Sequence, residues 1–346
     1  MEYQTLYRKY RPKNFKSVVG QEHVTDVLEH SLKEGAVSHA YLFFGSRGTG
    51  KTTVARILAD RLGVASVDIH EMDAASNRKI EDIRELREAV HVQPFESKYK
   101  IYILDEVHML TNEAFNALLK TLEEPPHYVI FILATTELHK VPDTIISRCQ
   151  VFTFKNPTKH ILKDHVLDVS KREGKDIEPD AAELVAFMGN GSFRDTQSIL
   201  QKVLTFSDAK KLSYEDVARV VGAPPKKLVQ DFVRALVDED KESLFLLIQK
   251  ASEHTLNMVL FIDLLITSLR KALLFRYAPD MKQDLQKELG EDLDFYKEVL
   301  QERKGIITSK TLDLFLEARE RQELAHIQTL PLELAVVKLF ESLDIT

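Results

Sequence analysis

Short apolar runs alternate with helical patterns over the first 156 residues of the chain. Five of these runs predict β-strands, because they are short, almost wholly apolar and rich in β-branched or aromatic residues. They are residues 41–44, 67–72, 101–104, 129–134 and 151–154. The stretches between them, such as 79–90 and 112–122, carry apolar residues at helical spacing. This alternation is typical of a parallel sheet under two layers of helices, so we expect each strand to be covered on both faces.

Beyond residue 156 the strand pattern stops and amphipathic helical patterns take over. A Gly-Ala-Pro-Pro run at residues 222–225 interrupts them, because neither glycine nor paired prolines fit well inside a helix. The sequence therefore predicts three domains: an α/β domain at 1–156, a small helical domain at 157–222 and an all-helical domain at 223–346. The predicted helices are 160–173, 179–188, 192–206, 214–221, 226–237, 241–251, 256–276, 293–303, 311–325 and 332–343.

Composition narrows the class of protein. The chain has 346 residues, 44% of them apolar and 29% charged, which excludes a disordered tail and predicts sizeable cores. No window approaches the roughly 18 apolar residues of a membrane helix, and the opening residues lack the apolar core of a secretion signal, so we expect a cytoplasmic protein without membrane association. The single cysteine, Cys149, excludes an internal disulfide and a cysteine-based zinc cage. With a formal net charge of -7, nucleic-acid contact depends on local basic patches.

The strongest chemical signal is a G-x-x-x-x-G-K-T motif between the strand predicted at 41–44 and the helical pattern at 54–62. In this setting, glycines allow successive backbone N–H groups and a helix N-terminus to face an anion. Lys51 would add a charge for the β- and γ-phosphates of a nucleotide, and the Thr52 hydroxyl would bind Mg²⁺. The alternative is a glycine-rich turn that matches the motif by chance. The candidate nucleotide contacts are Gly45, Ser46, Arg47, Gly48, Thr49, Gly50, Lys51, Thr52 and Thr53.

A pair of carboxylates, Asp105 and Glu106, ends the apolar run at 101–104. Asp105 would hold Mg²⁺ through water, and Glu106 would polarise the attacking water as a general base. An acidic pair at a strand end is also common as a solvated terminus. Together with the phosphate loop, the pair predicts an ATP hydrolase, because a passive nucleotide pocket has no need of a general base.

Two hydroxyls and two arginines extend this set. Thr135 and Thr136 follow the strand predicted at 129–134, where one of them would orient the lytic water; simple capping of the strand end is the alternative. Arg148 precedes the last strand, so it would point away from its own phosphate loop and reach only a neighbouring subunit's γ-phosphate. An ordinary surface arginine is the alternative there. Arg194 stands at a predicted helix start with Ser192 as N-cap, from which it would reach the same nucleotide.

The order of these motifs resembles the AAA+ clamp-loader family, and within it the tau/gamma subunits of bacterial DNA polymerase III. The resemblance rests on the phosphate loop followed by LDEVHML at 104–110, LATTE at 133–137, SRC at 147–149 and GSFRD at 191–195. The opening also matches, through YRKYRP at 7–12, Phe15 and VVGQ at 18–21, as do MDAASN at 72–77 and LPLELA at 330–335. The resemblance therefore spans nearly the whole chain.

The resemblance implies roles for individual residues. Arg148 would be an arginine finger that acts on the neighbouring subunit, and Arg194 would be the second sensor of the bound nucleotide. Thr135 or Thr136 would be the first sensor. The adenine pocket would be lined by Arg11, Val18 and Val19.

The resemblance also implies an assembly and a task. The cofactors would be ATP and Mg²⁺, and the helical regions at 157–222 and 223–346 would be a lid and a collar. Through the collar, five subunits would form an open ring, with delta-like and delta-prime-like partners. ATP binding would let the ring hold a beta-type sliding clamp open on primer-template DNA, and hydrolysis would release the clamp closed. We expect this work in the cytoplasm, at the nucleoid during replication.

One departure from the family pattern stands out. Family members normally carry a zinc module of four cysteines before the Asp-Ala-Ala-Ser strand, whereas here residues 61–66 lead almost directly into 67–72. Zinc is therefore not expected, and a small-subunit-type clamp loader stays open as an alternative. So do another AAA+ DNA-processing ATPase and an ATP-binding scaffold subunit that scarcely hydrolyses. No extension of the longer tau type follows the collar, so we expect a gamma-like form or a shortened chain.

A candidate DNA contact lies at the start of the helix predicted at 79–90. Asn77, Arg78 and Lys79 combine a helix N-terminus with adjacent cations, which suits a phosphate backbone. Binding of this kind would be insensitive to base sequence and weakened by salt. The alternative is a solvated helix start without a ligand.

Overall fold

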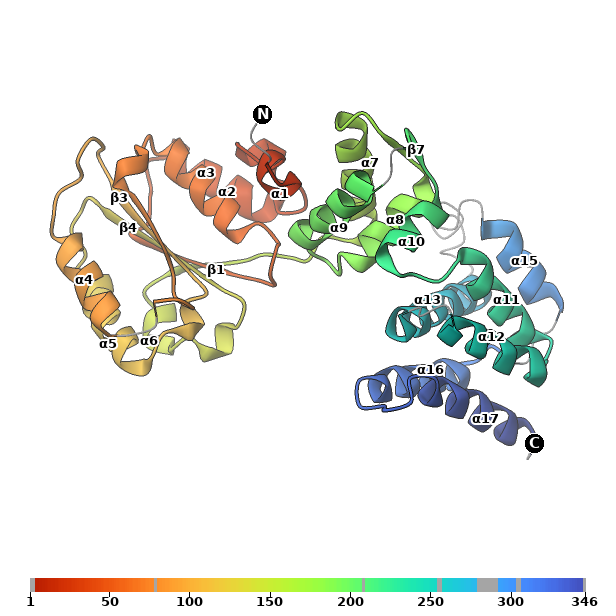
Figure 1. Ribbon diagram of the computed structural model, residues 1–346. Helices are drawn as coiled ribbons and strands as arrows, with labels where there is room; N and C mark the ends of the chain where they lie inside the picture. Colours follow the sequence, from red (N-terminus) through yellow and green to blue (C-terminus); the bar gives the residue numbers. More distant parts are fainter. Residues whose placement is uncertain are drawn as a thin grey trace. The chain divides into compact units, whose positions relative to one another are not determined.

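The computed structural model describes residues 4–77, 80–206, 209–253, 257–278, 292–302 and 306–344. The chain forms two compact units, Met1–Lys210 and Lys211–Thr346, and each is described by itself (Figure 1). The division at Lys210 lies between the two boundaries that the sequence predicts, at residues 156 and 222. The three-domain division stays a prediction.

A five-stranded sheet forms the centre of the first unit, in the order β2-β3-β4-β1-β5. Every pair of neighbouring strands is parallel, which confirms the predicted parallel sheet. In such a sheet the carboxyl ends of the strands all lie along one edge. The strands are β1 (Ala40–Phe44), β2 (Ile69–Asp73), β3 (Lys100–Asp105), β4 (Val129–Thr135) and β5 (Gln150–Thr153).

Alternate side chains of the central strands enter two separate cores, as the twofold period of a strand requires. Phe43 of β1 belongs to the core under α2 and α3, whereas its neighbour Leu42 belongs to the core under α4 and α5. Figure 1 shows these helix pairs on opposite faces of the sheet. Their bounds are α2 (Glu22–Lys33), α3 (Lys51–Arg61), α4 (Ile80–Val90) and α5 (Asn112–Glu123).

The two edge strands depart from the prediction. The central strands β1, β3 and β4 are buried along nearly their whole length, but β2 and β5 expose most of their residues. The expectation that every strand is covered on both faces is therefore wrong for the edges. The predicted start of the strand at 67–72 is also wrong, because residues 67 and 68 belong to a 3-10 helix, η2 (Ser66–Asp68), that precedes β2.

The Asp68 side chain explains this 3-10 helix. Asp68 is only 1% exposed, and its carboxylate accepts hydrogen bonds from the backbone N–H groups of Phe95 (2.6 Å), Glu96 (2.9 Å) and Ser97 (2.8 Å). Burial alone would raise the pKa of Asp68, but these N–H donors outweigh it and lower the pKa to about 2. The carboxylate thus joins the start of β2 to the segment that leads into β3.

We expect Asp68→Asn to lower the free energy of unfolding by about 1–3 kcal/mol at pH 7, because an amide leaves part of this donor set unsatisfied. The depressed pKa means that the ionised carboxylate stabilises the fold above about pH 4, and that this contribution is lost as the pH falls toward 2. Denaturant unfolding at pH 7 and pH 3 measures both effects. The difference in the free energy of unfolding between the parent and Asp68→Asn should be smaller at pH 3. The control Asp60→Asn, at an exposed position of α3, should have the parental free energy of unfolding at both pH values.

The remaining elements of the first unit are mostly helical. Leu162, Val166 and Leu200 are buried among the three longest of these helices. Helix α8 confirms its predicted bounds, and α7 and α9 differ from theirs by one residue. The elements are α1 (Leu6–Lys9), η1 (Phe15–Ser17), η3 (Val107–Met109), η4 (Leu138–Lys140), α6 (Asp143–Ile146), α7 (Lys159–Arg172), β6 (Asp176–Ile177), α8 (Pro179–Met188) and α9 (Phe193–Phe206).

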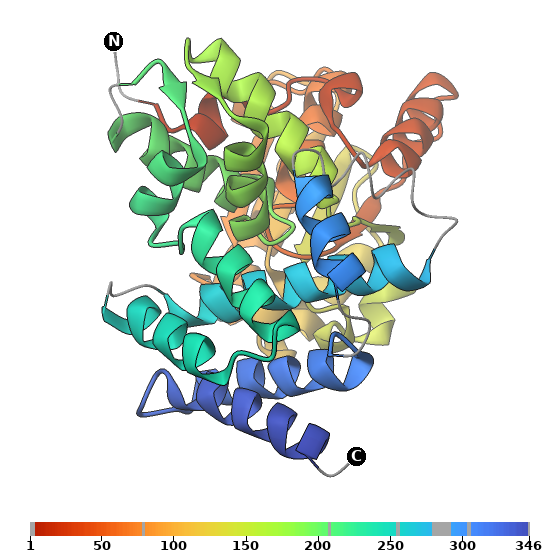
Figure 2. The same cartoon turned by 90° about the vertical axis from the view of Figure 1, so that its right-hand side faces the viewer.

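The second unit is helical apart from the short β7 (Lys211–Leu212), in the part of the chain that the structure describes. Phe232, Phe261 and Phe315 meet edge-to-face at the centre of one apolar cluster. Figures 1 and 2 both show α16 and α17 side by side. The helices confirm the all-helical prediction: α10 (Tyr214–Val221), α11 (Lys226–Val237), α12 (Lys241–Glu253), α13 (Met258–Tyr277), α15 (Leu293–Glu302), α16 (Ser309–Gln322) and α17 (Leu330–Asp344).

Candidate nucleotide-binding site

The predicted phosphate loop connects β1 to α3 at the carboxyl edge of the sheet. The loop is braced from inside, since the Thr49 hydroxyl donates to the Ser46 carbonyl (2.9 Å). Gly50 has a left-handed backbone (φ 105°) at the N-cap of α3, so the helix begins directly at Lys51. Thr53 lies in the first turn. The first N–H groups of this helix have no intrahelical acceptor, and a helix N-terminus of this kind binds anions.

Lys51 is held inside the loop. Its side chain is almost fully buried, and Nζ donates to the carbonyls of Gly45 (2.7 Å) and Ser46 (3.0 Å). Burial lowers the pKa of Lys51, while Glu106 and Asp105 act in the opposite direction. The ammonium group is therefore poorly solvated and lies where the motif brings phosphate oxygens.

Thr52 and Asp105, the two residues predicted to hold Mg²⁺, lie in direct contact. The Thr52 hydroxyl donates to Asp105 Oδ2 (2.9 Å), although 53 positions separate them along the chain. Hydroxyl and carboxylate oxygens suit the hard Mg²⁺ ion, which keeps several waters when it binds a nucleotide. The residues present therefore fit Mg²⁺ bound together with ATP.

Glu106 lies beside this pair with its carboxylate held in place. Its backbone is left-handed (φ 50°), which is uncommon for a residue other than glycine. Glu106 Oε2 accepts hydrogen bonds from Thr136 N (3.2 Å) and Thr136 Oγ1 (3.0 Å). The two threonines thus differ, since Thr136 contacts the candidate base, whereas Thr135 is fully buried and accepts from Glu137 N (3.0 Å). Their assignment as the first sensor stays a prediction.

The start of α9 touches the phosphate loop directly. Phe193 N donates to the carbonyl of Gly48 (3.1 Å), and a Cβ at Gly48 would lie 2.0 Å from Ser192 Oγ. Arg194 follows on the same helix, with its guanidinium 5.1 Å from the centre of the Tyr7 ring. The helix that carries the predicted second sensor is therefore seated on the loop, and the role of Arg194 stays a prediction.

We expect Gly48→Ala to weaken ATP binding by about tenfold or more, because the new methyl group must displace Ser192 and with it the start of α9. Equilibrium titration with a fluorescent ATP analogue measures the effect. Gly63→Ala is the matched control, since Gly63 has nearly the same φ (+70° against +76°) but no heavy atom within 4 Å of its Cβ position. A Gly48→Ala chain that binds ATP as tightly as Gly63→Ala would show that the contact with Ser192 does not limit nucleotide binding.

Arg148 lies away from the phosphate loop of its own chain. Parallel pairing places Gln150, the first residue of β5, beside Tyr41, whereas the loop follows Phe44. At about 3.3 Å per residue, the starts of the loop and of β5 are separated by about 13 Å along the sheet. The guanidinium donates to Thr144 O (2.7 Å) and to Glu123 Oε1 (2.6 Å). This position is compatible with the predicted contact of Arg148 with the γ-phosphate of a neighbouring subunit, and that contact stays a prediction.

The predicted adenine-pocket residues have different surroundings. Val18 packs into the core under α2 and α3, whereas Val19 is 49% exposed. Arg11 is half-buried; burial lowers the pKa of its guanidinium, and the neighbouring Arg56 acts in the same direction. The structure does not join the three residues into one described pocket, and their role stays a prediction.

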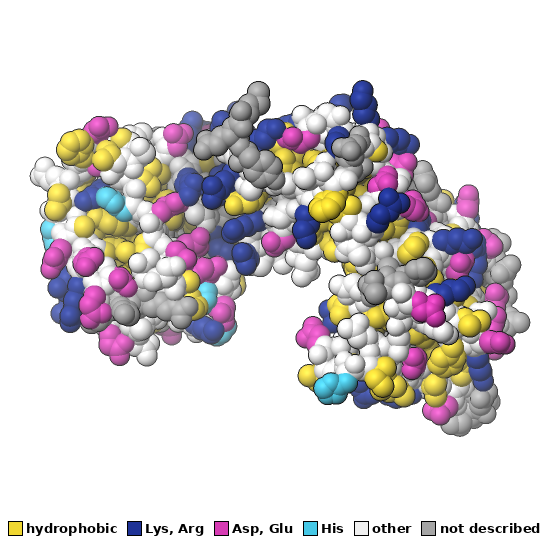
Figure 3. Space-filling model, viewed as in Figure 1, with side chains coloured by type: hydrophobic (Ala, Val, Ile, Leu, Met, Phe, Trp, Pro, Cys, Tyr) yellow, Lys and Arg dark blue, Asp and Glu magenta, His cyan; other side chains and the backbone are white. Residues whose placement is uncertain are grey.

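The predicted DNA contact is described only in part. Asn77 donates through Nδ2 to the carbonyl of Asp73 (3.0 Å) at the end of β2, while Arg78 and Lys79 lie outside the described residues. Lys and Arg side chains are interspersed with Asp and Glu on the face drawn in Figure 3. DNA binding through Asn77, Arg78 and Lys79 therefore stays a prediction.

Two polar residues of the site were not found from the sequence. His108 lies between Glu106 and Glu137, with 3.4 Å and 3.3 Å between the nearest nitrogen and oxygen atoms. Asn156 accepts a hydrogen bond from the Ser46 hydroxyl of the phosphate loop. His108 stands two positions after Glu106, but neither residue belongs to a spacing pattern that indicates a contact.

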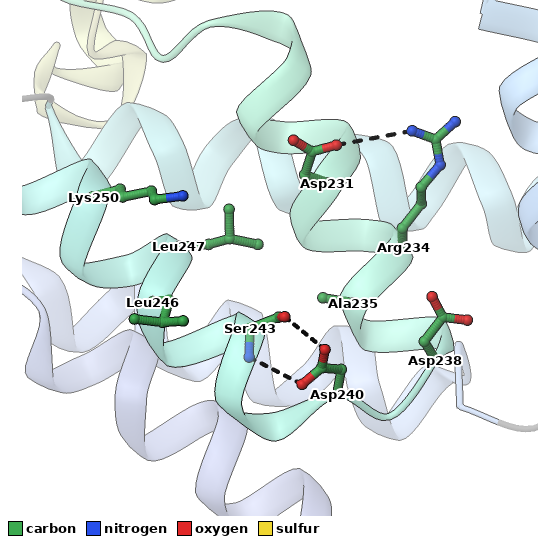
Figure 4. A pocket seen from close by; sticks show the side chains of 9 residues that line it. All are labelled: Asp231, Arg234, Ala235, Asp238, Asp240, Ser243, Leu246, Leu247 and Lys250. Atoms are coloured by element: carbon green, nitrogen blue, oxygen red, sulfur yellow. Dashed lines mark hydrogen bonds and ion pairs between the residues drawn. The ribbon is translucent and has the colours of Figure 1, made fainter.

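A pocket of about 280 Å³ lies between α11 and α12 in the second unit (Figure 4). Four of its polar residues bond in two pairs: Asp231 pairs with Arg234 (3.8 Å), and Asp240 accepts from Ser243 N (3.0 Å). The pocket is lined by Asp231, Arg234, Ala235, Asp238, Asp240, Ser243, Leu246, Leu247 and Lys250, none of which belongs to the phosphate loop.

None of the described helices is both long and apolar enough to cross a membrane.

The chain is similar to known subunits of bacterial DNA polymerase III. The family model described as DNA polymerase III, delta subunit, matches residues 20–78 and 63–158. The tau subunit of DNA polymerase III from Bacillus subtilis is 34% identical over 99% of this chain and 64% of its own length. The gamma/tau subunit from Mycoplasma genitalium is 40% identical over 75% and 47%, and the gamma subunit from Buchnera aphidicola (subsp. Schizaphis graminum) is 35% identical over 73% and 75%. The chain thus spans about half to three quarters of these relatives.

Solved structures support the fold. The Holliday junction branch migration motor RuvB of Thermotoga maritima superposes with a TM-score of 0.52, covering 66% of this chain and 79% of RuvB. The sequences are 22% identical, so the likeness concerns the fold alone. It agrees with the predicted α/β fold, a parallel sheet between helices.

Proposed function

Since the chain belongs to the gamma/tau family of bacterial DNA polymerase III subunits, we propose that it is the ATP-hydrolysing motor subunit of a clamp loader. The observation that supports this most is the hydrogen bond from Thr52 to Asp105, with Glu106 beside it. It joins the phosphate loop to the acidic end of β3, the two parts that ATP hydrolysis requires. An ATP-binding scaffold would not need a positioned Glu106.

Each residue of the site has a task in this proposal. Bound Mg²⁺ would neutralise charge on the β- and γ-phosphates of ATP, and Thr52 and Asp105 would hold it. Lys51 exchanges its carbonyl partners for phosphate oxygens, and Glu106 accepts a proton from the attacking water. Arg194 senses the nucleotide from α9. Arg148 completes the site of the neighbouring subunit, where a guanidinium stabilises charge in the transition state.

The proposal extends to partners that the family suggests. The chain would join delta-like and delta-prime-like subunits in a ring of five, open a beta-type sliding clamp and place it on primer-template DNA. Contacts with DNA would be to the backbone and would weaken with salt. The assembly would work in the cytoplasm, at the nucleoid during replication, together with the polymerase.

Steady-state ATP hydrolysis tests the proposal, with the sliding clamp and primer-template DNA each omitted in turn. We expect ATP hydrolysis to be strongly stimulated only when both the clamp and the DNA are present. Lys51→Ala should show no hydrolysis, because it should lose ATP binding. Hydrolysis that is indifferent to clamp and DNA would overturn the replication role but not the ATPase. A parent chain that binds ATP without hydrolysing it, even in the complete assembly, would leave the scaffold alternative.

A further inference from the structure

His108 has a largely buried side chain that lies between two carboxylates beside the candidate hydrolytic site. Its side chain is 7% exposed, on η3 directly after the Asp105-Glu106 pair. Nδ1 lies 3.4 Å from Glu106 Oε2, and Nε2 lies 3.3 Å from Glu137 Oε1. Each ring nitrogen thus faces an acceptor, and the imidazole spans the distance between the candidate base and the segment after β4.

The contacts of Glu106 distinguish its two carboxylate oxygens. The hydrogen bonds from Thr136 N and Thr136 Oγ1 both end on Oε2, and His108 Nδ1 also faces Oε2. In the part of the chain that the structure describes, no hydrogen bond ends on Oε1. One oxygen is therefore fixed by the protein, and the other stays available to accept a proton from water.

The imidazole is itself held from both ends. Nδ1 also contacts Thr135 Oγ1 (3.0 Å), and Thr135 is fully buried at the end of β4. On the far side, Glu137 Oε2 pairs with Lys140 Nζ (2.9 Å). A side chain with partners at both nitrogens and little exposed surface keeps one orientation, which lets it fix a neighbour.

We infer that His108 is a positioning residue that keeps Oε2 of Glu106 against β4 and thereby directs Oε1 toward the attacking water. Glu137 in turn orients the imidazole. The inference rests on the proposed ATPase function and adds to it the residue that aims the base. His108 touches neither nucleotide nor water in this role; it acts through Glu106.

Two substitutions distinguish the roles of the two ring nitrogens of His108. The amide of His108→Asn replaces Nδ1 and keeps the contact toward Glu106, whereas that of His108→Gln replaces Nε2 and keeps only the contact toward Glu137. We expect kcat to fall by about 10- to 100-fold in His108→Gln and His108→Ala, with ATP affinity unchanged, and to stay near the parental value in His108→Asn. Asparagine is the smaller of the two by one methylene group, so a loss of packing alone would affect His108→Asn more than His108→Gln, the opposite of the expected order.

A second arm tests whether the effect passes through Glu106. Adding His108→Ala to Glu106→Gln should not lower the rate beyond that of Glu106→Gln alone, because residues that act as a unit are not additive. A third arm needs neither nucleotide nor activity. In chain labelled with ¹⁵N-histidine, Glu106→Gln should shift the Nδ1 resonance of His108, and Glu137→Gln should shift Nε2.

The outcomes distinguish this inference from the proposed function. A parent chain without ATPase activity in the complete assembly would overturn the proposed function, while the imidazole resonances still report the contacts. A parent chain that hydrolyses ATP, with equal losses in His108→Asn and His108→Gln, would overturn the positioning role. So would a further loss when His108→Ala is added to Glu106→Gln, or imidazole resonances that neither carboxylate variant shifts.

Discussion

Replacing Glu106 by glutamine should lower the rate of ATP hydrolysis by about 10²–10⁴-fold, the usual contribution of a general base. Glutamine keeps the shape of the side chain and can still accept the hydrogen bonds from Thr136, but its amide cannot take a proton from water. ATP affinity should stay unchanged, because Lys51 and Thr52 are untouched. Single-turnover hydrolysis with the chain in excess, together with equilibrium binding, separates the two quantities.

The control for this prediction is Glu34→Gln, which neutralises an exposed carboxylate at the end of α2. It should leave both quantities at the parental value. A Glu106→Gln chain that hydrolyses ATP at the parental rate would remove Glu106 from the role of base. A chain that loses ATP affinity together with the rate would instead assign Glu106 to nucleotide binding.

Arg148→Ala should lower hydrolysis in the assembly by about 10³-fold or more, within the range of arginine fingers, and should spare ATP binding by the isolated chain. The ion pair with Glu123 is no obstacle to such a role. Both side chains are partly exposed, and pairs of this kind contribute only about 0–1 kcal/mol, so the guanidinium can exchange the carboxylate for a phosphate. ATPase measurements on reconstituted assemblies test the prediction.

A mixing experiment distinguishes action on a neighbour from action within one chain. Lys51→Ala keeps Arg148 but should bind no ATP, whereas Arg148→Ala keeps an intact site but lacks the finger. Each variant alone should be nearly inactive, and assemblies that contain both should regain part of the activity. Arg172→Ala, which removes an exposed arginine paired with Asp168, serves as the control. An absence of recovery would contradict the predicted role of Arg148.

The parts of the fold that were predictable depend on short stretches of sequence. The central strands β1, β3 and β4 are apolar runs, and their residue types alone indicate burial. The phosphate loop is equally local, since its glycines, Lys51 and Thr52 are contiguous. Asp105 and Glu106 could be assigned because the end of a parallel strand fixes where their side chains lie.

The rest depends on contacts between distant residues. The strand predicted from residue 67 begins late because Asp68 binds backbone groups at residues 95–97, a preference that no local pattern contains. Edge strands cannot be told from central ones until the strand order is known. Residues 22–33, which form α2, had no predicted element. The position of His108 likewise depends on Thr135 at the end of β4 and on Glu137 in the segment after it.

The hydrogen bond from Phe193 to Gly48 has a thermodynamic consequence. It makes the conformation of the phosphate loop and the seating of α9 one coupled equilibrium, so a ligand that favours one state of the loop also favours one position of the helix. Such coupling is reciprocal: a partner that restrains α9 changes the affinity for nucleotide by the same factor, without touching the nucleotide. A typical coupling free energy of about 1–3 kcal/mol corresponds to about 5- to 150-fold. In the proposed function, this one backbone N–H group couples the position of α9 to the affinity for nucleotide.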